Sequence, residues 1–152
     1  MNLIFKILIL IAFTLNSKQS YSQEIKHKKI IGPIATVNII EGRIKFTGRV
    51  DTGAKTTSIN AKNIKRKNDY VQFTLVNKQG QEISMKAKII DERNVFSAEK
   101  REKRYFIYLT LAYDGITKKT LVNLNDRSKS TYKILLGRNW LKGKYIVDVS
   151  IN

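Results

Sequence analysis

The sequence predicts an all-β protein, and three features of its pattern support this. Short runs of alternating apolar and polar residues recur along the chain, as in Tyr70–Val76 (YVQFTLV). Turn-forming residues separate these runs at close intervals, which is typical of a β-barrel or β-sandwich. No window of 11 residues has the apolar spacing of an amphipathic helix. With 152 residues, the chain is long enough for one such domain and hardly for two.

Eight strands are expected, and glycines mark three of the turns between them. Glu41-Gly42 separates the first two strands, Asn77–Gly80 the third and fourth, and Tyr113-Asp114-Gly115 the fifth and sixth. Turns of this kind favour hairpins between neighbouring strands. The expected strands span Ile34–Ile40, Arg43–Val50, Tyr70–Val76, Glu82–Ile90, Arg104–Ala112, Lys118–Leu124, Lys133–Leu136 and Lys144–Ile151.

Three other segments lack the strand pattern. Asn60–Asp69 and Asp91–Lys103 are polar and basic, and we expect both to be irregular. Arg138–Lys142 is expected to form a single helical turn between the last two strands. The predicted architecture is therefore one all-β lobe with one short C-terminal helix.

The N-terminus has the layout of a secretory signal. A weakly basic start precedes the apolar run Ile7–Leu15 (ILILIAFTL), and two serines stand before a plausible cut ahead of Gln23. The run is shorter than the roughly 20 apolar residues that a membrane span needs. We expect a signal peptide at 1–22, a polar leader at 23–30, a domain at 31–152, and a periplasmic or secreted protein with no stable membrane span after cleavage. A retained N-terminal anchor is the alternative.

The chain is strongly basic, with 29 Lys and Arg against 12 Asp and Glu and a formal net charge of +17. The runs Lys62–Lys67 (KNIKRK) and Lys100–Arg104 (KREKR) concentrate this charge. It favours contact with polyanions, although a basic run is more often a solvated surface. We expect no nucleic-acid partner, because no DNA- or RNA-binding motif with interleaved aromatic residues is present.

The composition excludes several catalytic mechanisms. The sequence has no Cys and one His, His27, whereas a zinc hydrolase needs three or four suitably spaced ligands. Gly137–Tyr145 (GRNWLKGKY) departs from a phosphate-binding loop, because Lys144 is followed by Tyr145 rather than by Ser or Thr. No G-x-S-x-G elbow accompanies the single His. We therefore expect no metal and no cofactor, and carboxylate chemistry remains.

Asp51 is the carboxylate best placed for such chemistry. It ends the apolar run Phe46–Val50, and Gly53 allows the backbone to turn sharply after it. Thr52 supplies a hydroxyl group, and Ala54 completes the motif Asp-Thr-Gly-Ala. Taken alone, the motif has a second interpretation: an Asx turn in which the Asp51 side chain accepts hydrogen bonds from backbone amides.

A second motif near the C-terminus gives this loop a packing partner. Ile134–Asn139 (ILLGRN) places three apolar residues before a glycine, an arginine and an asparagine. Asp-Thr-Gly-Ala combined with this later motif resembles the retropepsins, the retroviral-type aspartic proteases. The resemblance implies a closed barrel with one lobe and one flap hairpin per chain. It also implies that the Asp51 loop is packed and braced by Leu135, Leu136, Gly137, Arg138 and Asn139.

Further short motifs lie in the same order along most of the chain: Ile31-Gly32, Arg93-Asn94-Val95, Glu102–Tyr105, Asn123–Arg127 and Val147-Asp148. Together they resemble a bacterial branch of retropepsin-like aspartic endopeptidases. This branch is often labelled "ATP-dependent zinc protease" and is linked to RimK-type glutamate ligases. The label implies ATP and zinc, which the residues of this chain do not favour. The chain departs from the branch at Ser97–Lys103 (SAEKREK) and at Val149, which puts the substrate preference in doubt.

The resemblance implies a homodimer, because an aspartic protease needs two carboxylates and this chain carries one Asp-Thr-Gly motif. The two Asp51 side chains would lie about 3 Å apart, share one proton and activate a water molecule. Thr52 would link the two loops across the two-fold axis. Val50, Ala54 and Leu135 would line the shared cavity.

The order of elements assigns the flap to the hairpin Tyr70–Ile90, with its tip at Asn77, Lys78, Gln79 and Gly80. Lys55, which follows the motif directly, and the basic surface suggest acidic peptide substrates. The predicted function is an exported aspartic endopeptidase. Two alternatives remain open: a catalytically inactive β-barrel that binds peptides or polyanions, and a basic adhesion or structural domain of the cell envelope.

Overall fold

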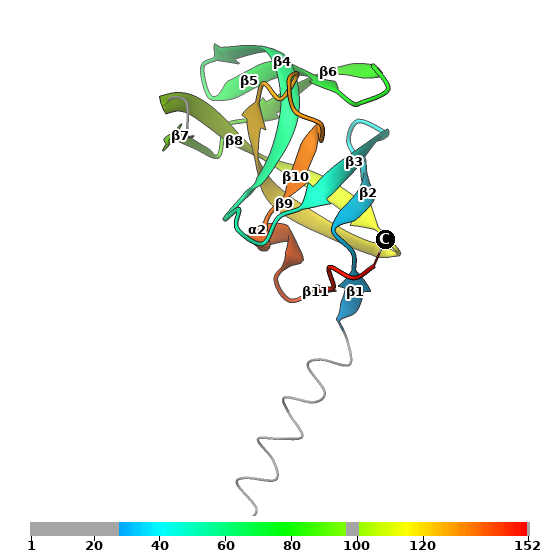
Figure 1. Ribbon diagram of the computed structural model, residues 1–152. Coiled ribbons are helices and arrows are strands. Elements are labelled where there is room, and N and C mark those ends of the chain that lie inside the picture. The colour runs from blue at the N-terminus through cyan, green and yellow to red at the C-terminus, as the bar shows by residue number, and fades with distance from the viewer. Residues whose placement is uncertain (1–27, 97–100, 152) are drawn as a thin grey trace, which may run out of the picture.

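The computed structural model describes residues 28–96 and 101–151. The expected signal peptide (1–22) and most of the expected leader (23–30) lie outside these residues. Within them, the chain forms eleven strands and one short helix (Figure 1). In order, the elements are β1 (Lys29–Ile31), β2 (Ile34–Ile39), β3 (Ile44–Val50), β4 (Thr57–Lys67), β5 (Tyr70–Val76), β6 (Glu82–Lys88), β7 (Asp91–Phe96), β8 (Arg101–Tyr113), β9 (Ile116–Asn125), β10 (Ile134–Leu136), α2 (Arg138–Leu141) and β11 (Tyr145–Val147).

Six of the strands close into a barrel. They are hydrogen-bonded in the order β10, β3, β2, β8, β9 and β4, and β4 pairs back with β10. The short strand β10 makes this closure possible because it runs parallel to β3 on one side and antiparallel to β4 on the other. The predicted all-β barrel with one short C-terminal helix is confirmed.

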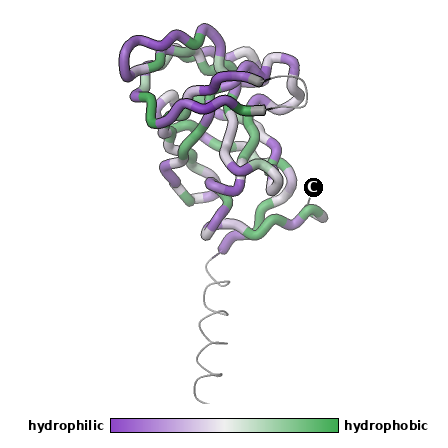
Figure 2. The backbone as a smooth tube through the Cα atoms, turned by 90° about the vertical axis from the view of Figure 1, so that its left-hand side faces the viewer, coloured by the Kyte–Doolittle hydropathy of each residue, from purple (hydrophilic) through white to green (hydrophobic). Residues whose placement is uncertain are grey.

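The barrel encloses the core because its strands alternate between buried and exposed side chains. In β3, for example, Ile44 and Phe46 are buried and Lys45 between them is exposed. Figure 2 shows this alternation as changes of hydropathy along the strands. The largest fully buried side chains are Trp140, Phe46, Phe106, Ile31, Ile39, Ile44, Ile59, Leu75, Ile107, Leu109, Leu111 and Leu124.

Strand β4 corrects the expectation that Asn60–Asp69 is irregular. It runs from the barrel into a second layer, where it pairs with β5, and β5 pairs with β6. The register shifts between Lys62 and Lys65, and Asn63 has a positive φ of 53°. This bulge interrupts the alternation of side chains between the two faces of the strand. Because the lysines around it are exposed, the segment also lacks the apolar alternation by which a strand is recognised in a sequence.

Asp91–Lys103 was also expected to be irregular, and its described part is instead strand. β7 pairs antiparallel with the first half of β8. Charged residues support this hairpin: the Lys103 ammonium lies 2.5 Å from the Glu92 carboxylate, which also accepts a hydrogen bond from Arg66 on β4 at 2.9 Å. Cross-strand ion pairs of this kind replace the apolar alternation by which strands are recognised.

The two ends of the described chain meet in a separate two-stranded parallel sheet of β1 and β11. In Figure 1 this sheet lies at the opposite end of the molecule from β5 and β6. Among residues 28–96 and 101–151, no helix has the length and apolar character required to cross a membrane.

Candidate active site

Asp51 follows directly after β3, at the point where β3 and β10 run side by side. Its backbone amide donates a hydrogen bond to the Leu136 carbonyl at 3.0 Å, which extends the pairing of the two strands. Gly48 makes this approach possible, because a Cβ atom at that position would lie 2.3 Å from the Ile134 side chain and 2.9 Å from its carbonyl oxygen. The strand before Asp51 is therefore fixed by the C-terminal motif.

The carboxylate of Asp51 closes its own turn. Oδ1 accepts hydrogen bonds from the backbone amides of Gly53 at 2.9 Å and Ala54 at 3.1 Å. Within the described part of the chain, the second carboxylate oxygen accepts no hydrogen bond. Asp51 is half-buried, while Thr52 and Gly53 are exposed. One oxygen thus has a structural role, and the other is available for a water molecule, a ligand or another carboxyl group.

Arg138 holds the turn from the helix side. Its guanidinium Nη1 donates to the carbonyl oxygens of Thr52 at 2.8 Å and Gly53 at 2.7 Å. Its backbone amide donates to the Ala54 carbonyl at 2.9 Å. These carbonyls have no strand partner, so the arginine supplies the bonds that a β-ladder would otherwise provide.

Asn139 connects the loop to the next strand. Its side-chain oxygen accepts hydrogen bonds from the Thr57 amide at 2.9 Å and the Thr57 hydroxyl at 3.1 Å, and its side-chain nitrogen donates to the Leu121 carbonyl at 2.7 Å. Thr57 is fully buried and was not among the site residues predicted from the sequence. Only the strand character of β4 could have indicated that this hydroxyl points inward.

Gly137 allows the two segments to touch. A Cβ atom there would lie 2.6 Å from the Thr56 carbonyl carbon and 2.9 Å from the Thr57 nitrogen. The Gly137 amide donates to the Thr57 hydroxyl at 3.2 Å. The structure therefore brings the predicted bracing residues of the C-terminal motif directly onto the Asp51 loop.

A cavity of about 860 Å³ opens beside this loop. Its wall comes from the segment after Asp51, from the β7–β8 hairpin, from β9 and from the loop after β9. Basic side chains in the wall outnumber acidic ones by four to two. The lining residues are Ala54, Lys55, Thr56, Ser58, Val95, Glu102, Arg104, Asn123, Asn125, Asp126, Arg127, Ser128, Lys129, Ser130 and Leu135.

Arg104 and Arg127 are two of the cavity residues that were not predicted as site residues from the sequence, although both lie in the motifs on which the family resemblance rests. Arg104 has a buried Nε without a hydrogen-bond partner among the described residues. Burial lowers the pKa of Arg127, the neighbouring charge of Arg104 lowers it further, and the charge of Asp51 raises it. Asp51 therefore acts electrostatically on Arg127.

The structure does not bring the predicted flap tip to Asp51. Asn77 is buried at the β5–β6 turn, and its side-chain nitrogen donates to the Lys45 carbonyl at 3.1 Å. Lys45 lies near the start of β3 and Asp51 just after its end, which is about 20 Å along an extended strand. The β7–β8 hairpin contributes Val95, Glu102 and Arg104 to the cavity wall and so takes the position beside the site.

Zinc does not fit the donor set of this chain. In the described residues, no three His, Cys, Asp or Glu side chains gather closely enough to hold a metal ion. The cavity wall offers mainly cationic and amide or hydroxyl groups, whereas zinc sites use imidazole, thiolate and carboxylate ligands.

The closed six-stranded barrel, the Asp51 loop and the glycine-arginine-asparagine brace define a retropepsin-like protein. Residues 30–152 match the family described as RimB-like, retropepsin-like aspartic endopeptidase RimB. The chain belongs to this family, as the resemblance of its motifs predicted.

Two curated relatives are similar to part of the chain. Each is 36% identical over 110 residues and is named "Probable alpha-L-glutamate ligase", one from Shewanella pealeana and one from Shewanella halifaxensis. The match covers 67% of this chain and 24% of each relative, so the chain corresponds to about a quarter of their length.

A solved structure has the same fold. It is the crystal structure of Lpg0085, a protein described as having unknown function (DUF785), from Legionella pneumophila. The two structures align with a TM-score of 0.69 at 25% sequence identity, over 82% of this chain and 95% of the other.

Proposed function

We propose that this protein is an exported aspartic endopeptidase whose catalytic pair forms between the Asp51 side chains of two protomers. One carboxylate would accept a proton from a water molecule, while the protonated carboxyl group would polarise the carbonyl of the scissile peptide bond. Two carboxylates about 3 Å apart cannot both ionise readily, so the pair would hold one shared proton.

The observation that carries this proposal is that the two oxygens of the Asp51 carboxylate differ in their hydrogen bonding. Oδ1 is held by two backbone amides, and the loop around it is held by Arg138. The other oxygen is left without a hydrogen bond in the part of the chain that the structure describes. A structural Asx turn does not need a long-range brace from a second motif, whereas a catalytic carboxylate has to be held in one orientation.

An exposed apolar surface beside this loop supports dimerisation. Ile30 and Ile146 are paired neighbours on β1 and β11 and are 60% and 41% exposed, and Val149 nearby is 80% exposed. The connection between β1 and β2 reaches the site directly, because the Val50 amide donates to the Pro33 carbonyl at 2.8 Å. A second copy that covered this surface would also approach the exposed Thr52.

The cavity favours an acidic peptide substrate. Lys55 and Lys129 are exposed at its wall, and Arg104 and Arg127 lie deeper. The name of the curated relatives, alpha-L-glutamate ligase, agrees with an acidic substrate. In a peptide library we expect cleavage next to Glu or Asp, and we expect Lys55→Gln with Lys129→Gln to weaken this preference. Cleavage that is indifferent to acidic residues in the parent protein would contradict this part of the proposal.

The catalytic proposal is tested by replacing Asp51 and by removing metal. Asp51→Asn is expected to lower the rate of peptide cleavage by about a thousandfold. The far-ultraviolet circular dichroism and the oligomeric state should stay unchanged, because an amide oxygen can still cap the turn. A chelator is expected to leave cleavage by the parent protein unchanged. Cleavage that survives Asp51→Asn, or that a chelator removes, would reject the mechanism.

Dimerisation can be tested separately because the sequence contains no cysteine. Thr52→Cys is expected to form a covalent dimer on mild oxidation, because Thr52 is proposed to lie near the two-fold axis. Thr117→Cys, at an exposed position on β9, is the matched control and should stay monomeric on a denaturing gel. Absence of the Thr52→Cys dimer, together with a monomer in sedimentation, would contradict the shared site.

A catalytically inactive binding protein is the second candidate, and the single Asp-Thr-Gly motif per chain favours it. Such a protein would use the basic cavity to hold an acidic peptide without cleaving it. Binding of a glutamate-rich peptide at every pH without cleavage by the parent protein would support this candidate over the enzyme.

A further inference from the structure

The second layer of the molecule carries a set of lysines that the proposed active site does not use. Lys62, Lys65 and Lys67 lie on β4, Lys86 and Lys88 lie on β6, and all five are exposed. We call these five residues, with the β5 side chains between them, the lysine face. It lies at the end of the molecule away from the terminal β1–β11 sheet (Figure 1).

The strand register places these lysines on one side of the sheet. Lys65 is opposite Gln72, and Gln72 is opposite Lys86. Cross-strand neighbours in register point to the same side of a sheet, so these three side chains form one row. The register forms two further rows in the same way, Lys67–Tyr70–Lys88 and Lys62–Thr74–Ser84. Without the β4 bulge, Lys62 and Lys65 would point to opposite sides.

The lysine face has little acidic compensation. Lys62 lies 3.9 Å from the Glu82 carboxylate, and this is the ion pair that the face contains within the described residues. Asp69 borders it in the turn between β4 and β5. The remaining lysines have no carboxylate partner among residues 28–96 and 101–151. Four cations are therefore left uncompensated on one sheet surface, and they attract an anionic ligand.

The shape of the lysine face selects the kind of ligand. The lysines of β4 and β6 form two columns about 10 Å apart, with β5 between them. A hollow of about 560 Å³ lies between the columns, and its lining includes Lys65, Gln72 and Lys86. Lys65 and Lys67 on β4 are two residues apart, as are Lys86 and Lys88 on β6. This spacing of about 6.7 Å is that of side chains on one side of an extended peptide.

Nucleic acid and membrane surfaces fit this geometry less well. Tyr70 is the one aromatic side chain in the three rows of the face, and the Lys86 ammonium lies 4.6 Å from the centre of its ring. One face of this ring is thus already in contact with an ammonium group, and a single ring offers little surface for stacked bases. The three rows also contain no large aliphatic side chain to enter a bilayer, which interfacial binding requires.

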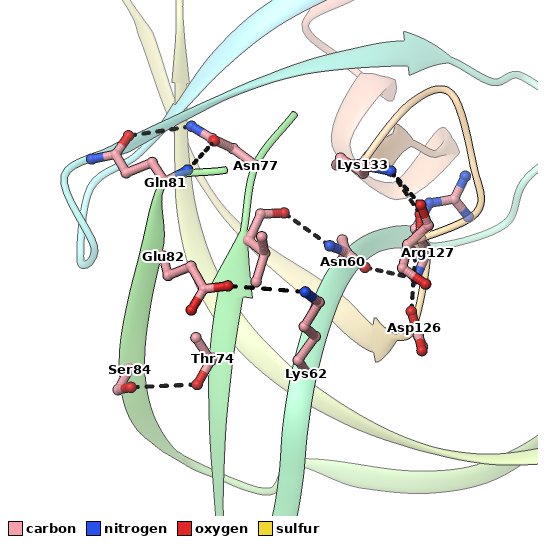
Figure 3. A network of polar contacts seen from close by, with 12 residues as sticks. Asn60, Lys62, Thr74, Asn77, Gln81, Glu82, Ser84, Asp126, Arg127 and Lys133 are labelled. Carbon is pink, nitrogen blue, oxygen red and sulfur yellow. Dashed lines mark hydrogen bonds and ion pairs between the residues drawn. The ribbon is translucent and has the colours of Figure 1, made fainter. Parts of the chain in front are cut away.

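Strand β4 connects the lysine face to the candidate active site. Ser58 near its start lines the cavity, and Asn60, two residues on, accepts a hydrogen bond from the Arg127 amide at 2.7 Å. Lys62 lies two residues after Asn60 and so points to the same side of β4. Figure 3 shows Asn60 with Arg127 and Lys62 with Glu82 along this strand. The lysine face and the cavity therefore share one strand, with the buried Asn60 between them.

We propose that the lysine face is a binding site for an extended acidic polypeptide segment, which lies along β5 with its carboxylates between the two lysine columns. Binding of an acidic segment to the lysine face does not depend on catalysis at Asp51. The further role of the lysine face as an exosite, which would hold a substrate outside the cleavage cavity, rests on the proposed function.

The test measures binding of a fluorescent decaglutamate peptide to the full chain carrying Asp51→Asn, which prevents cleavage. The lysine-face variant adds Lys65→Gln, Lys67→Gln, Lys86→Gln and Lys88→Gln. The matched control adds Lys45→Gln, Lys119→Gln, Lys142→Gln and Lys144→Gln, four exposed lysines outside the face, and so loses the same charge. We expect the face variant to bind on the order of tenfold more weakly and the control to change less than twofold.

Equal weakening in both variants would overturn the proposal, because it would show that net charge alone governs binding. A single-stranded oligonucleotide, or vesicles containing anionic phosphatidylglycerol, that bound more tightly through the same four lysines would also overturn it. A decaglutamine peptide should not bind. If the parent protein cleaves no peptide while the face variant still loses decaglutamate binding, the proposed catalytic function fails and the lysine face stands.

Discussion

The loops that begin at Asp51 and at Asn77 share the same local chemistry and differ in what surrounds it. In each loop one side-chain oxygen accepts two backbone amides, those of Gly53 and Ala54 in the first and of Gln79 and Gln81 in the second. The other polar atom of Asn77 is fully used, because its nitrogen donates to the Lys45 carbonyl and the Gln81 side chain. The corresponding atom of Asp51 is left free within the described residues.

This difference shows how a structural turn and a candidate catalytic turn can be distinguished. The Asn77 loop is satisfied by its own hairpin and one neighbouring strand. The Asp51 loop is held by a motif more than 80 residues away, through Arg138 and Asn139. A distant brace has a cost in folding entropy that a simple turn does not need. Such a brace therefore indicates that the orientation of the Asp51 carboxylate matters.

The largest effect on activity is expected when the side chains of the two loops are exchanged, Asp51 for Asn and Asn77 for Asp. Asp51→Asn should lower kcat for peptide cleavage by about a thousandfold, since it removes an ionisable group from the proposed pair. Asn77→Asp should change kcat less than twofold, because the Asn77 loop lies far from the cavity. Steady-state kinetics on one acidic peptide measures both variants. Similar losses in the two variants would remove the distinction between the loops.

The close contact behind the Asp51 loop is expected to have the next largest effect. Gly137→Ala places a methyl group 2.6 Å from the Thr56 backbone and should lower the free energy of unfolding by about 3 kcal/mol. Gly53→Ala is the control, because its added Cβ would lie 3.2 Å from the Asp51 side chain in an otherwise open position. Urea denaturation compares the two. An equal, small loss would show that the loop and the C-terminal motif can separate at little cost.

The arginine brace is expected to contribute to both stability and activity. Arg138→Ala removes two hydrogen bonds to loop carbonyls, and we expect a loss of about 2 kcal/mol of unfolding free energy and at least a tenfold fall in kcat. Arg43→Ala, at an exposed position of the first hairpin turn, should change neither. If Arg138→Ala kept full kcat, the brace would be structural only, like the contacts of Asn77.

The smallest effect is expected at the satisfied loop. Asn77→Ala removes the cap of two amides and the bond to the Lys45 carbonyl, and should lower the unfolding free energy by about 1 kcal/mol with water replacing part of the loss. The kcat should stay within twofold of the parent value. A large fall in kcat would instead place the β5–β6 hairpin in the catalytic cycle, as the flap assignment from the sequence predicted.

The sequence predicted the strands and turns because these depend on local signals, and it predicted the Asp51 loop because two distant motifs together resemble one family. Hairpins with glycine turns, such as the one at Asp114 and Gly115, appear with the expected positive φ values of 47° and 75°. The flap was assigned by order along the chain, and order does not show which hairpin faces the cavity. Which hairpin faces the cavity depends on the parallel pairing of β4 with β9, a strand distant in the sequence, and no local sequence pattern indicates this pairing. Arg104 and Arg127 were missed for the same reason, because their shared cavity exists only after this pairing.

Strand β10 has three residues, yet it completes both the barrel and the setting of Asp51. During synthesis the chain emerges from its N-terminus, so Asp51 leaves the ribosome long before Leu136 and Arg138. Until those residues arrive, the ring of strands has a gap and the loop has no brace. The order of residues along the chain therefore leaves the Asp51 loop open and without its arginine until β10 and α2 have been synthesised.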